Sequence, residues 1–234
     1  MTKEISLHTW LISQSLTPQQ ADLWGDFIAD AFDLIDDGHA LHCTPNEWSS
    51  FLSGCNATLP TEPEITSGLG DRMIHLQAGA PIDSDRDRLQ IGYEIPTGGD
   101  HSHGIRKSKA DFQFRRKFEA GYAASFVIEA KPLRTPADMN KRYLGREGIG
   151  CFLERNPPYS NDTVVGMMGY AFRNHLDWLQ LLKSNLSSFS KKIDLVDVLL
   201  PSGRTCPVSN HDRSSIGLSN VTVCHTILNY ASNG

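Results

Sequence analysis

Apolar and polar residues alternate in the middle of the chain in a way that indicates two adjoining strands. Phe112, Phe114 and Phe118 alternate with polar residues, and Phe126-Val127-Ile128 follows as a compact apolar run. The first pattern is typical of a strand with one buried face, and the second of a strand in the core. A glycine lies between the two runs. The pattern therefore predicts an antiparallel hairpin over residues 110–133.

Helical patterns precede this hairpin, and alternating helices and strands follow it. Three helix starts share a hydroxyl cap, a nearby proline and a Glu or Gln that can reach back: Thr17-Pro18-Gln19-Gln20, Thr44-Pro45-Asn46-Glu47 and Thr61-Glu62-Pro63-Glu64. The first two helices are expected to end at Gly38 and Gly54. Strands are expected over 89–95, 164–172, 195–200 and 221–230, with a helix from Asn174. This order predicts an α/β domain with a mixed central sheet flanked by helices over 57–234, after a helical N-terminal segment over 1–56.

Two acids and a lysine are expected to lie close together if the hairpin turn centres on residue 120. Paired residue numbers then sum to 240, so Asp111 faces Glu129 on the same side of the sheet. Bare carboxylates about 5 Å apart repel each other, and a divalent cation would resolve the conflict. Lys131 lies on the same face as Glu129. The alternative is an exposed face of ordinary ion pairs, although Glu129 lies between apolar neighbours, where a buried acid needs a partner.

Asp111 followed by Glu129-Ala130-Lys131 resembles the motif of the PD-(D/E)xK, or restriction-endonuclease-like, nuclease superfamily, with Ala110 where the motif name has proline. The resemblance implies a restriction-endonuclease-like fold and an Mg²⁺ site, with Mn²⁺ as a substitute. It implies metal ligands at Asp111, Glu129, the Ala130 carbonyl and Glu64, with Asp111, Glu129 and Lys131 catalytic. Glu64 has an equal alternative role, because its spacing from Thr61 completes a capping box.

The second half of the chain adds a narrower resemblance. The run from Gly145 to Tyr230, with GREGIG, GMMGYAF, HDR and HTILNY, is similar to small nuclease-like proteins of bacterial defence loci. We therefore expect a nuclease of an anti-phage system, acting on DNA rather than RNA, with a partner from the same operon or a second copy of itself. The alternative is an inactive subunit of the same fold that binds nucleic acid or a partner protein.

Charge is distributed unevenly along the chain. The net charge is −5, yet residues 106–117 hold six basic residues around the single acid Asp111. A local basic cluster is the usual footprint of a phosphate-binding site. The helix after residue 17 instead carries Asp22, Asp26, Asp30 and Asp33 on one face, which indicates a solvated face or a partner surface. The residues expected to bind nucleic acid are Arg106, Lys107, Lys109, Arg115, Arg116, Arg142 and Arg146.

Composition limits the remaining function classes. The 234 residues, 39% hydrophobic and 21% charged, suit one globular domain. Five scattered cysteines without a CxxC pair indicate neither a disulfide framework nor a zinc site. His101 and His103 are read as exposed loop residues, and His211 and Arg213 as loop residues that could touch nucleic acid. With no long apolar run and no signal-like N-terminus, we expect a cytoplasmic protein without a membrane partner.

Overall fold

The computed structural model describes residues 5–57, 59–97, 108–119, 122–173, 176–188, 193 and 195–231. Within them the chain forms helices and strands in the following order: β1 (Ile5–Ser6), α1 (Leu7–Ser13), α2 (Pro18–His42), α3 (Pro45–Gly54), α4 (Glu62–Ala78), β2 (Gln90–Pro96), β3 (Lys109–Glu119), β4 (Tyr122–Leu133), α5 (Pro136–Asp138), the π-helical turn η2 (Met139–Tyr143), α6 (Gly150–Leu153), β5 (Val164–Ala171), α7 (Trp178–Ser187), β6 (Val196–Leu199), β7 (Thr205–His211), the 3₁₀ turn η3 (Ser214–Ile216) and β8 (Val221–Asn229).

All strands among the described residues belong to one mixed sheet in the order β1-β6-β7-β8-β5-β4-β3-β2. The centre is parallel, because β5 pairs with both β4 and β8 in that sense. Antiparallel pairs β2–β3–β4 and β6–β7–β8 flank it. The predicted α/β class with a mixed sheet is confirmed. Every residue of β5 is buried, as a central parallel strand covered on both faces requires.

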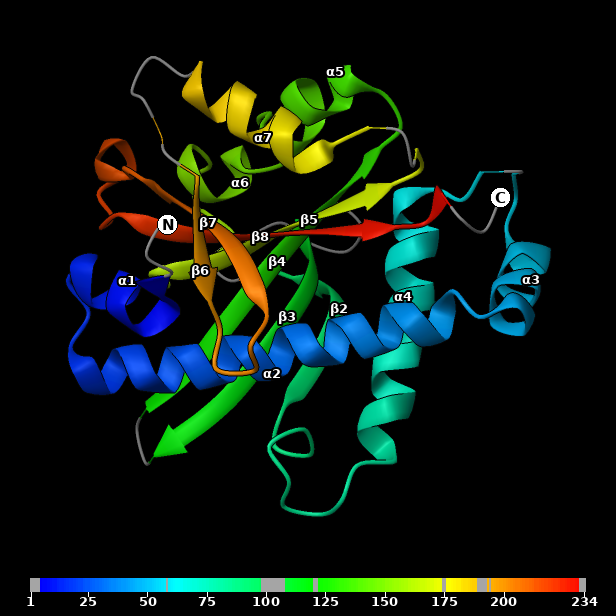
Figure 1. Cartoon of the computed structure of the whole chain (residues 1–234), viewed down its shortest axis with the longest axis horizontal. Coiled ribbons are helices and arrows are strands. Elements are labelled where there is room, and N and C mark those ends of the chain that lie inside the picture. Colours follow the sequence, from blue (N-terminus) through cyan, green and yellow to red (C-terminus); the bar gives the residue numbers. More distant parts are fainter. Residues whose placement is uncertain are drawn as a thin grey trace.

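Helices cover the two faces of the sheet (Figure 1), and each face has its own apolar core. On one face, α2 and α4 pack against even-numbered residues of β3 and β4, such as Phe112 and Phe126. On the other face, η2, α6 and α7 pack against odd-numbered residues such as Val127 and Met167. No helix among the described residues is long and apolar enough to cross a membrane.

The N-terminal helices share the first core with the sheet. The ring centroids of Phe27 and Phe32 on α2 lie 6.5 and 5.7 Å from that of Phe126 on β4. Residues 1–56 and 57–234 are therefore joined by one apolar core through these contacts.

One predicted helix end is wrong for an instructive reason. We expected the helix that starts after Thr17 to stop at Gly38, but α2 continues to His42. Gly38 lies where α2 crosses α4, and a Cβ there would approach Met73 Cγ to 2.7 Å. The glycine therefore permits close helix packing rather than ending the helix. The expected end of α3 at Gly54 is confirmed.

The expected loop before the last strand is wrong for His211, whereas Arg213 does lie in the segment between β7 and η3. Thr205–His211 forms β7, which pairs with β6 and β8. His211 is 4% exposed, and Arg213 is fully buried. The Arg213 guanidinium donates to the carbonyls of Ser160, Asp162 and Ser219, each at 2.9 Å. Neither residue is placed to touch nucleic acid, because both are enclosed by the fold.

Candidate metal centre

The hairpin of β3 and β4 has the predicted alignment. Its pairs run from Phe112 opposite Ile128 to Lys117 opposite Ala123, and each pair sums to 240. Beyond Phe112 the two strands no longer pair directly. The Asp111 carboxylate fills that position instead, accepting the Ala130 N–H at 2.7 Å. Because N–H and C=O of one strand residue point to the same side, the Ala130 carbonyl is directed toward the same position.

A third acid comes from the first residue of α4, a helix that contacts both β3 and β4. Carboxylate oxygens of Glu62, Asp111 and Glu129 all lie within 4.8 Å of one another. One turn along α4, the Thr66 hydroxyl lies 3.4 Å from Asp111 Oδ1 and 2.9 Å from the Tyr170 hydroxyl. The fold therefore gathers three carboxylates from three elements at the point where β3 leaves β4.

Glu62, not Glu64, is the acid that α4 contributes to this cluster. Glu64 accepts from the N–H groups of Thr61 and Asn56 at 2.7 and 3.0 Å, which completes the capping box. Its carboxylate is therefore turned back toward the helix start. Arg134, just after β4, donates to the Pro60 carbonyl at 2.8 Å and ties the start of α4 to the end of β4. The expectation that Glu64 is a metal ligand is corrected, and its capping alternative is confirmed.

Lys131 lies inside the cluster. Its ammonium is 2.6 Å from Glu62 Oε1 and 2.7 Å from Glu129 Oε1, and the residue is 7% exposed. Burial disfavours the charged form, but the carboxylates of Glu129, Asp111 and Glu62 outweigh it and raise the pKa of Lys131. The lysine is therefore a fixed positive charge at neutral pH. It neutralises part of the cluster and leaves an excess of negative charge when all three acids ionise.

The two strand acids hold protons unusually tightly. Burial raises the pKa of Asp111 to about 6, Lys131 opposes the shift, and Glu62 adds to it. Burial and the nearby Asp111 raise the pKa of Glu129 well above its ordinary value. Glu129 Oε2 is enclosed and has no hydrogen-bond partner among the described residues. A proton or a cation at this oxygen would satisfy it.

Cys151 on α6 and Tyr159 after it lie close enough to Glu129 to be affected by its charge. Burial and then the Glu129 charge raise the pKa of Cys151 to about 12, so the thiol stays protonated and is no nucleophile. The same two causes raise the pKa of Tyr159. The Arg155 guanidinium lies 5.1 Å from the centroid of the Tyr159 ring. The sequence did not identify these residues, because no local pattern in their segment indicates that it lies near β4.

The predicted basic residues have different environments. Arg106 and Lys107 lie outside the described residues. Arg115 and Arg146 are exposed. Lys109 pairs with Glu94 at 3.5 Å, and Arg142 with Asp138 at 3.4 Å.

Arg116 is not available to nucleic acid, which corrects its assignment. It is 8% exposed, pairs with Asp30 at 2.7 Å and donates to the Asp85 carbonyl at 2.9 Å. Its side chain follows the alternation of β3 toward α2, so it lies on the face opposite Arg115. This pair also removes Asp30 from the acidic helix face that we expected to be solvated or to meet a partner.

The function of this centre has to be inferred from its own residues and their surroundings. Comparison with models of protein families, with curated proteins and with solved structures finds no match for this chain.

Proposed function

We propose that this chain is an Mg²⁺-dependent nuclease that hydrolyses phosphodiester bonds, with DNA favoured over RNA. The observation that carries the proposal is the buried Glu129 Oε2, which has no described hydrogen-bond partner and lies within a ring of three carboxylates. Carboxylate and carbonyl oxygens are the ligands that Mg²⁺ and Mn²⁺ prefer. Asp111, Glu129, Glu62 and the Ala130 carbonyl would hold the ion.

The residues of the cluster divide the work between them. A bound Mg²⁺ would supply Lewis-acid polarisation of the phosphate and a lowered pKa for its water. Glu129 Oε1 accepts a hydrogen bond from Lys131, and Oε2 would bind the ion. Lys131, fixed between Glu62 and Glu129, presents an ammonium to the negative charge that develops on the phosphate. Thr66 and the Ala130 N–H orient Asp111.

The resemblance to the PD-(D/E)xK superfamily is compatible with this arrangement. An antiparallel hairpin carrying the acid and the ExK residues adjoins a parallel strand, and a preceding helix adds an acid. We extend the proposal to a restriction-endonuclease-like fold and to a nuclease of bacterial anti-phage defence. A partner from the same operon or a second copy of the chain belongs to the same proposal.

A non-catalytic subunit that binds nucleic acid or a partner is the second candidate. The observation that favours it is Lys131 itself, because one ammonium already pairs with two of the three acids without any ion. In that case the cluster is a buried ion-pair network that stabilises the hairpin against α4.

Cleavage assays on plasmid, linear and single-stranded substrates, with Mg²⁺, Mn²⁺ or EDTA, separate the two candidates. The nuclease proposal expects cleavage with the metals, none with EDTA, and none for Glu129→Gln. Glu64→Gln is the matched control, since it changes an acid of α4 that lies outside the cluster. Calorimetry without substrate gives a second readout. If Mg²⁺ and Mn²⁺ neither bind the wild type nor raise its melting temperature, the nuclease proposal fails.

A further inference from the structure

The outer face of β3 carries polar side chains that lead away from the acid cluster. Alternate residues of a strand share a face, so Gln113 and Arg115 follow one another on it, whereas Asp111, beyond the last pair with β4, contacts Thr66 on α4. At about 3.3 Å per residue, Gln113 lies about 7 Å and Arg115 about 13 Å from Asp111 along the strand. On the opposite face of the same strand, Phe112 and Phe114 are fully buried.

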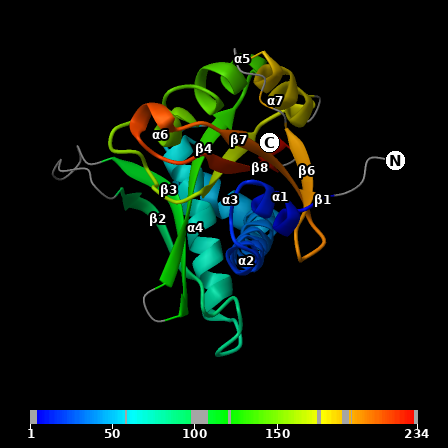
Figure 2. The same cartoon turned by 90° about the vertical axis from the view of Figure 1, so that its left-hand side faces the viewer.

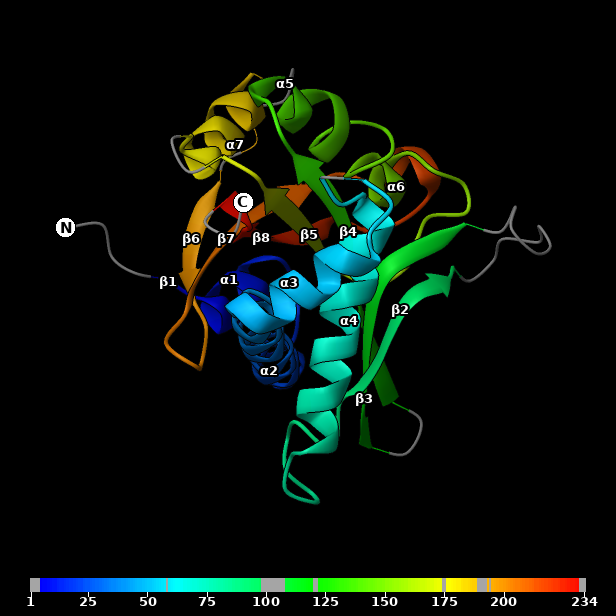
Figure 3. The same cartoon turned by 90° about the vertical axis from the view of Figure 1, so that its right-hand side faces the viewer.

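No described helix covers this outer face. Figures 2 and 3 show α4 on one side of β2 and β3 and no helix on the other. Arg115 is exposed, and its cross-strand neighbours are Gln90 on β2 and Ser125 on β4. Neither neighbour is an acid, and Arg115 has no ion pair among the described residues. Its charge is thus available to an external anion.

The surface beside Arg115 is polar. Gln113 pairs with Gly92 on one side and donates to the Ser125 hydroxyl at 2.7 Å on the other. Gly92 contributes no side chain, and the side chain of Ile95 on β2 lies where its Cβ would be. Aromatic side chains, on which bases stack, are absent from the described residues of this row. A polar row without stacking residues suits contacts to a phosphate backbone rather than to bases.

A second unpaired arginine lies at the cluster end of this face. Arg155 donates to the hydroxyl of Ser108, three residues before Asp111, and its guanidinium lies over the Tyr159 ring. It has no carboxylate partner among the described residues. Because the charges of both Glu129 and Arg155 act on Tyr159, the arginine lies in the electrostatic neighbourhood of the cluster. An arginine that is held in place and has no acid beside it can bind an anion without first breaking an ion pair.

We propose that the phosphate backbone of one substrate strand lies along the outer face of β3, with Arg155 holding the phosphate at the acid cluster and Arg115 a phosphate further along. This inference rests on the proposed function, because it places the reacting phosphate at that cluster. The ligand is then a nucleic acid bound through its phosphates, and this row of residues gives no preference for particular bases.

We call the outer face of β3 with Arg115 and Arg155 the platform. Binding measured without catalysis tests whether nucleic acid binds to it. Fluorescence anisotropy of single- and double-stranded oligonucleotides in EDTA, over a series of salt concentrations, gives the affinity and its salt dependence. Arg115→Gln and Arg155→Gln should each weaken binding several-fold for all sequences alike. Each should also reduce the slope of log K against log[salt] by about 1. Lys183→Gln, on α7 away from β3, removes the same charge and should change neither quantity.

Cleavage kinetics provide a second readout. Arg155→Gln should lower kcat, because it acts at the reacting phosphate, whereas Arg115→Gln should raise KM and leave kcat nearly unchanged. Unchanged salt slopes in both arginine variants, or an equal loss in Lys183→Gln, would overturn the platform. If the wild type cleaves while the arginine variants bind normally, the platform fails and the nuclease proposal stands. If the wild type binds through both arginines but does not cleave, the platform stands and the nuclease proposal fails.

Discussion

The two oxygens of Glu129 have different environments, and this difference determines the chemistry of the centre. Oε1 accepts from Lys131, whereas Oε2 is enclosed without a described donor. An unsatisfied buried charge is costly, so the carboxyl keeps a proton until something replaces it. Burial is the main cause of its raised pKa and of that of Asp111, about 6; the charge of Asp111 adds to the first shift, and the charge of Glu62 adds to both.

Cation binding should therefore release protons. Below about pH 6 a proton on Asp111 competes with the metal, so Mg²⁺ affinity should rise with pH from 5 to 7. Calorimetry at pH 6 in two buffers of different ionisation enthalpy measures the number of protons released. Asp111→Asn should reduce both the affinity and the proton release, whereas Glu64→Gln should retain both. A pH-independent affinity in the wild type would contradict this linkage.

Lys131 should support cleavage while opposing cation binding. Lys131→Met removes a positive charge 2.6–2.7 Å from two of the metal ligands, so Mg²⁺ affinity should be equal to or above that of the wild type while cleavage is lost. In EDTA at pH 8 the variant should lose up to about 3 kcal/mol of unfolding free energy, because the buried Glu129 and the half-buried Glu62 lose their partner.

Saturating Mg²⁺ should then restore more stability to Lys131→Met than it adds to the wild type. Denaturant titrations with and without Mg²⁺ measure this difference. If the variant loses cation affinity together with cleavage, Lys131 organises the ligands rather than competing with the ion.

At the scale of the elements, the start of α4 explains which acid reaches the centre. The sequence pattern Thr61-Glu62-Pro63-Glu64 places two acids within the first turn, and both are compatible with a ligand role. The capping box consumes the carboxylate at the third helical position, which leaves Glu62 at the first position to face β4. Local spacing could predict the cap, but only the packing of α4 against β4 reveals the partner of Glu62.

Gly68 on α4 and Gly54 at the end of α3 also differ in how closely their surroundings are packed. A Cβ at Gly68 would lie 2.9 Å from ring atoms of both His42 and Phe51, whereas a Cβ at Gly54 would meet nothing within 4 Å. Rings cannot yield as a flexible side chain can. Gly68→Ala should therefore lower the unfolding free energy by about 1–3 kcal/mol despite alanine's better helix propensity.

Gly54→Ala is the matched control for Gly68→Ala and should be neutral or slightly stabilising. Urea denaturation of both variants measures the difference. Equal stability of the two variants would mean that α4 moves away from α2 and α3 at little cost.

Short-range patterns predicted the fold well where each element carries its own signal. The alternating phenylalanines of β3 and the apolar run of β4 determine both the hairpin and its register. Asp111 lies beyond the last pair, where its carboxylate accepts the Ala130 N–H instead of pairing opposite Glu129. The polar segment of β7 carries no such signal, since its neighbours β6 and β8 make it a strand. Arg116 was misassigned because a basic run alone does not distinguish its members, although the alternation of Phe112, Phe114 and Phe118 places residue 116 on the buried face.

At the scale of the whole molecule, charges on α2 are directed inward as well as outward. Asp30 pairs with Arg116 on β3, and Asp36 with Arg204 beside β7. The acidic helix therefore uses part of its charge to bind the sheet. Charge reversal at Asp30 would leave Arg116 buried beside a like charge, so a loss of assembly in such a variant could not be separated from a loss of folding. Asp22 and Asp26 are the better positions at which to test a partner surface.

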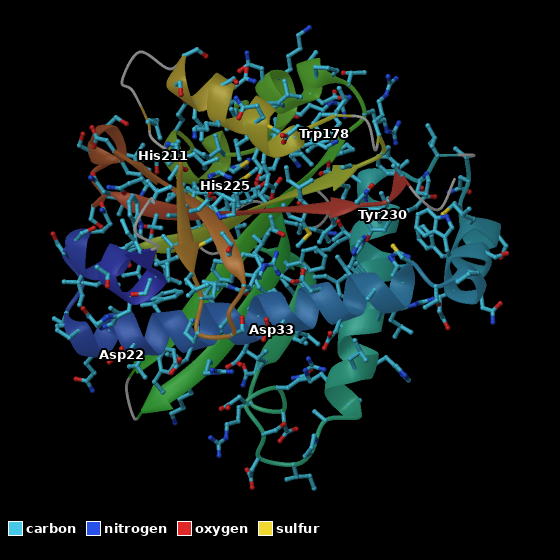
Figure 4. All side chains as sticks on the ribbon, in the orientation of Figure 1. Asp22, Asp33, Trp178, His211, His225 and Tyr230 are labelled. Carbon is cyan, nitrogen blue, oxygen red and sulfur yellow. The ribbon has the colours of Figure 1, made fainter. Side chains whose placement is uncertain are left out.

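A buried chain of hydrogen bonds joins the helical layer to the sheet. Tyr143 on η2 lies 3.0 Å from both the Met167 carbonyl and His225 Nδ1, and Ser209 lies 2.8 Å from His225 Nε2 and 2.7 Å from His211 Nε2. Figure 4 labels His211 and His225 on the adjacent strands β7 and β8. The carbonyl can only accept, so Tyr143 donates to it, and the remaining donors follow in order with both imidazoles neutral.

This network predicts acid sensitivity of the whole fold. Burial lowers the pKa of His211 to about 4 and that of His225 to about 3, and His42 behaves similarly at about 4. Between pH 6.5 and 4 the unfolded chain binds protons that the folded chain refuses, so each histidine makes stability fall as pH falls, by up to about 1.4 kcal/mol per pH unit. Asp111 and Glu129 change the stability in the opposite direction. Because their pKa values are raised in the folded chain, it binds more protons than the unfolded chain in acid, and their contribution to stability rises as pH falls.

Nuclear magnetic resonance separates these contributions, because each imidazole reports its own protonation. The ring signals of His211 and His225 should stay at their neutral positions from pH 7 down to pH 5, while the protein remains folded. Urea denaturation of Asp111→Asn over the same range should then show a steeper loss of stability with acid than the wild type, because one opposing carboxyl is gone. If either imidazole titrates near pH 6.5 in the folded protein, it is open to water, and the hydrogen-bond chain does not hold the two layers together in solution.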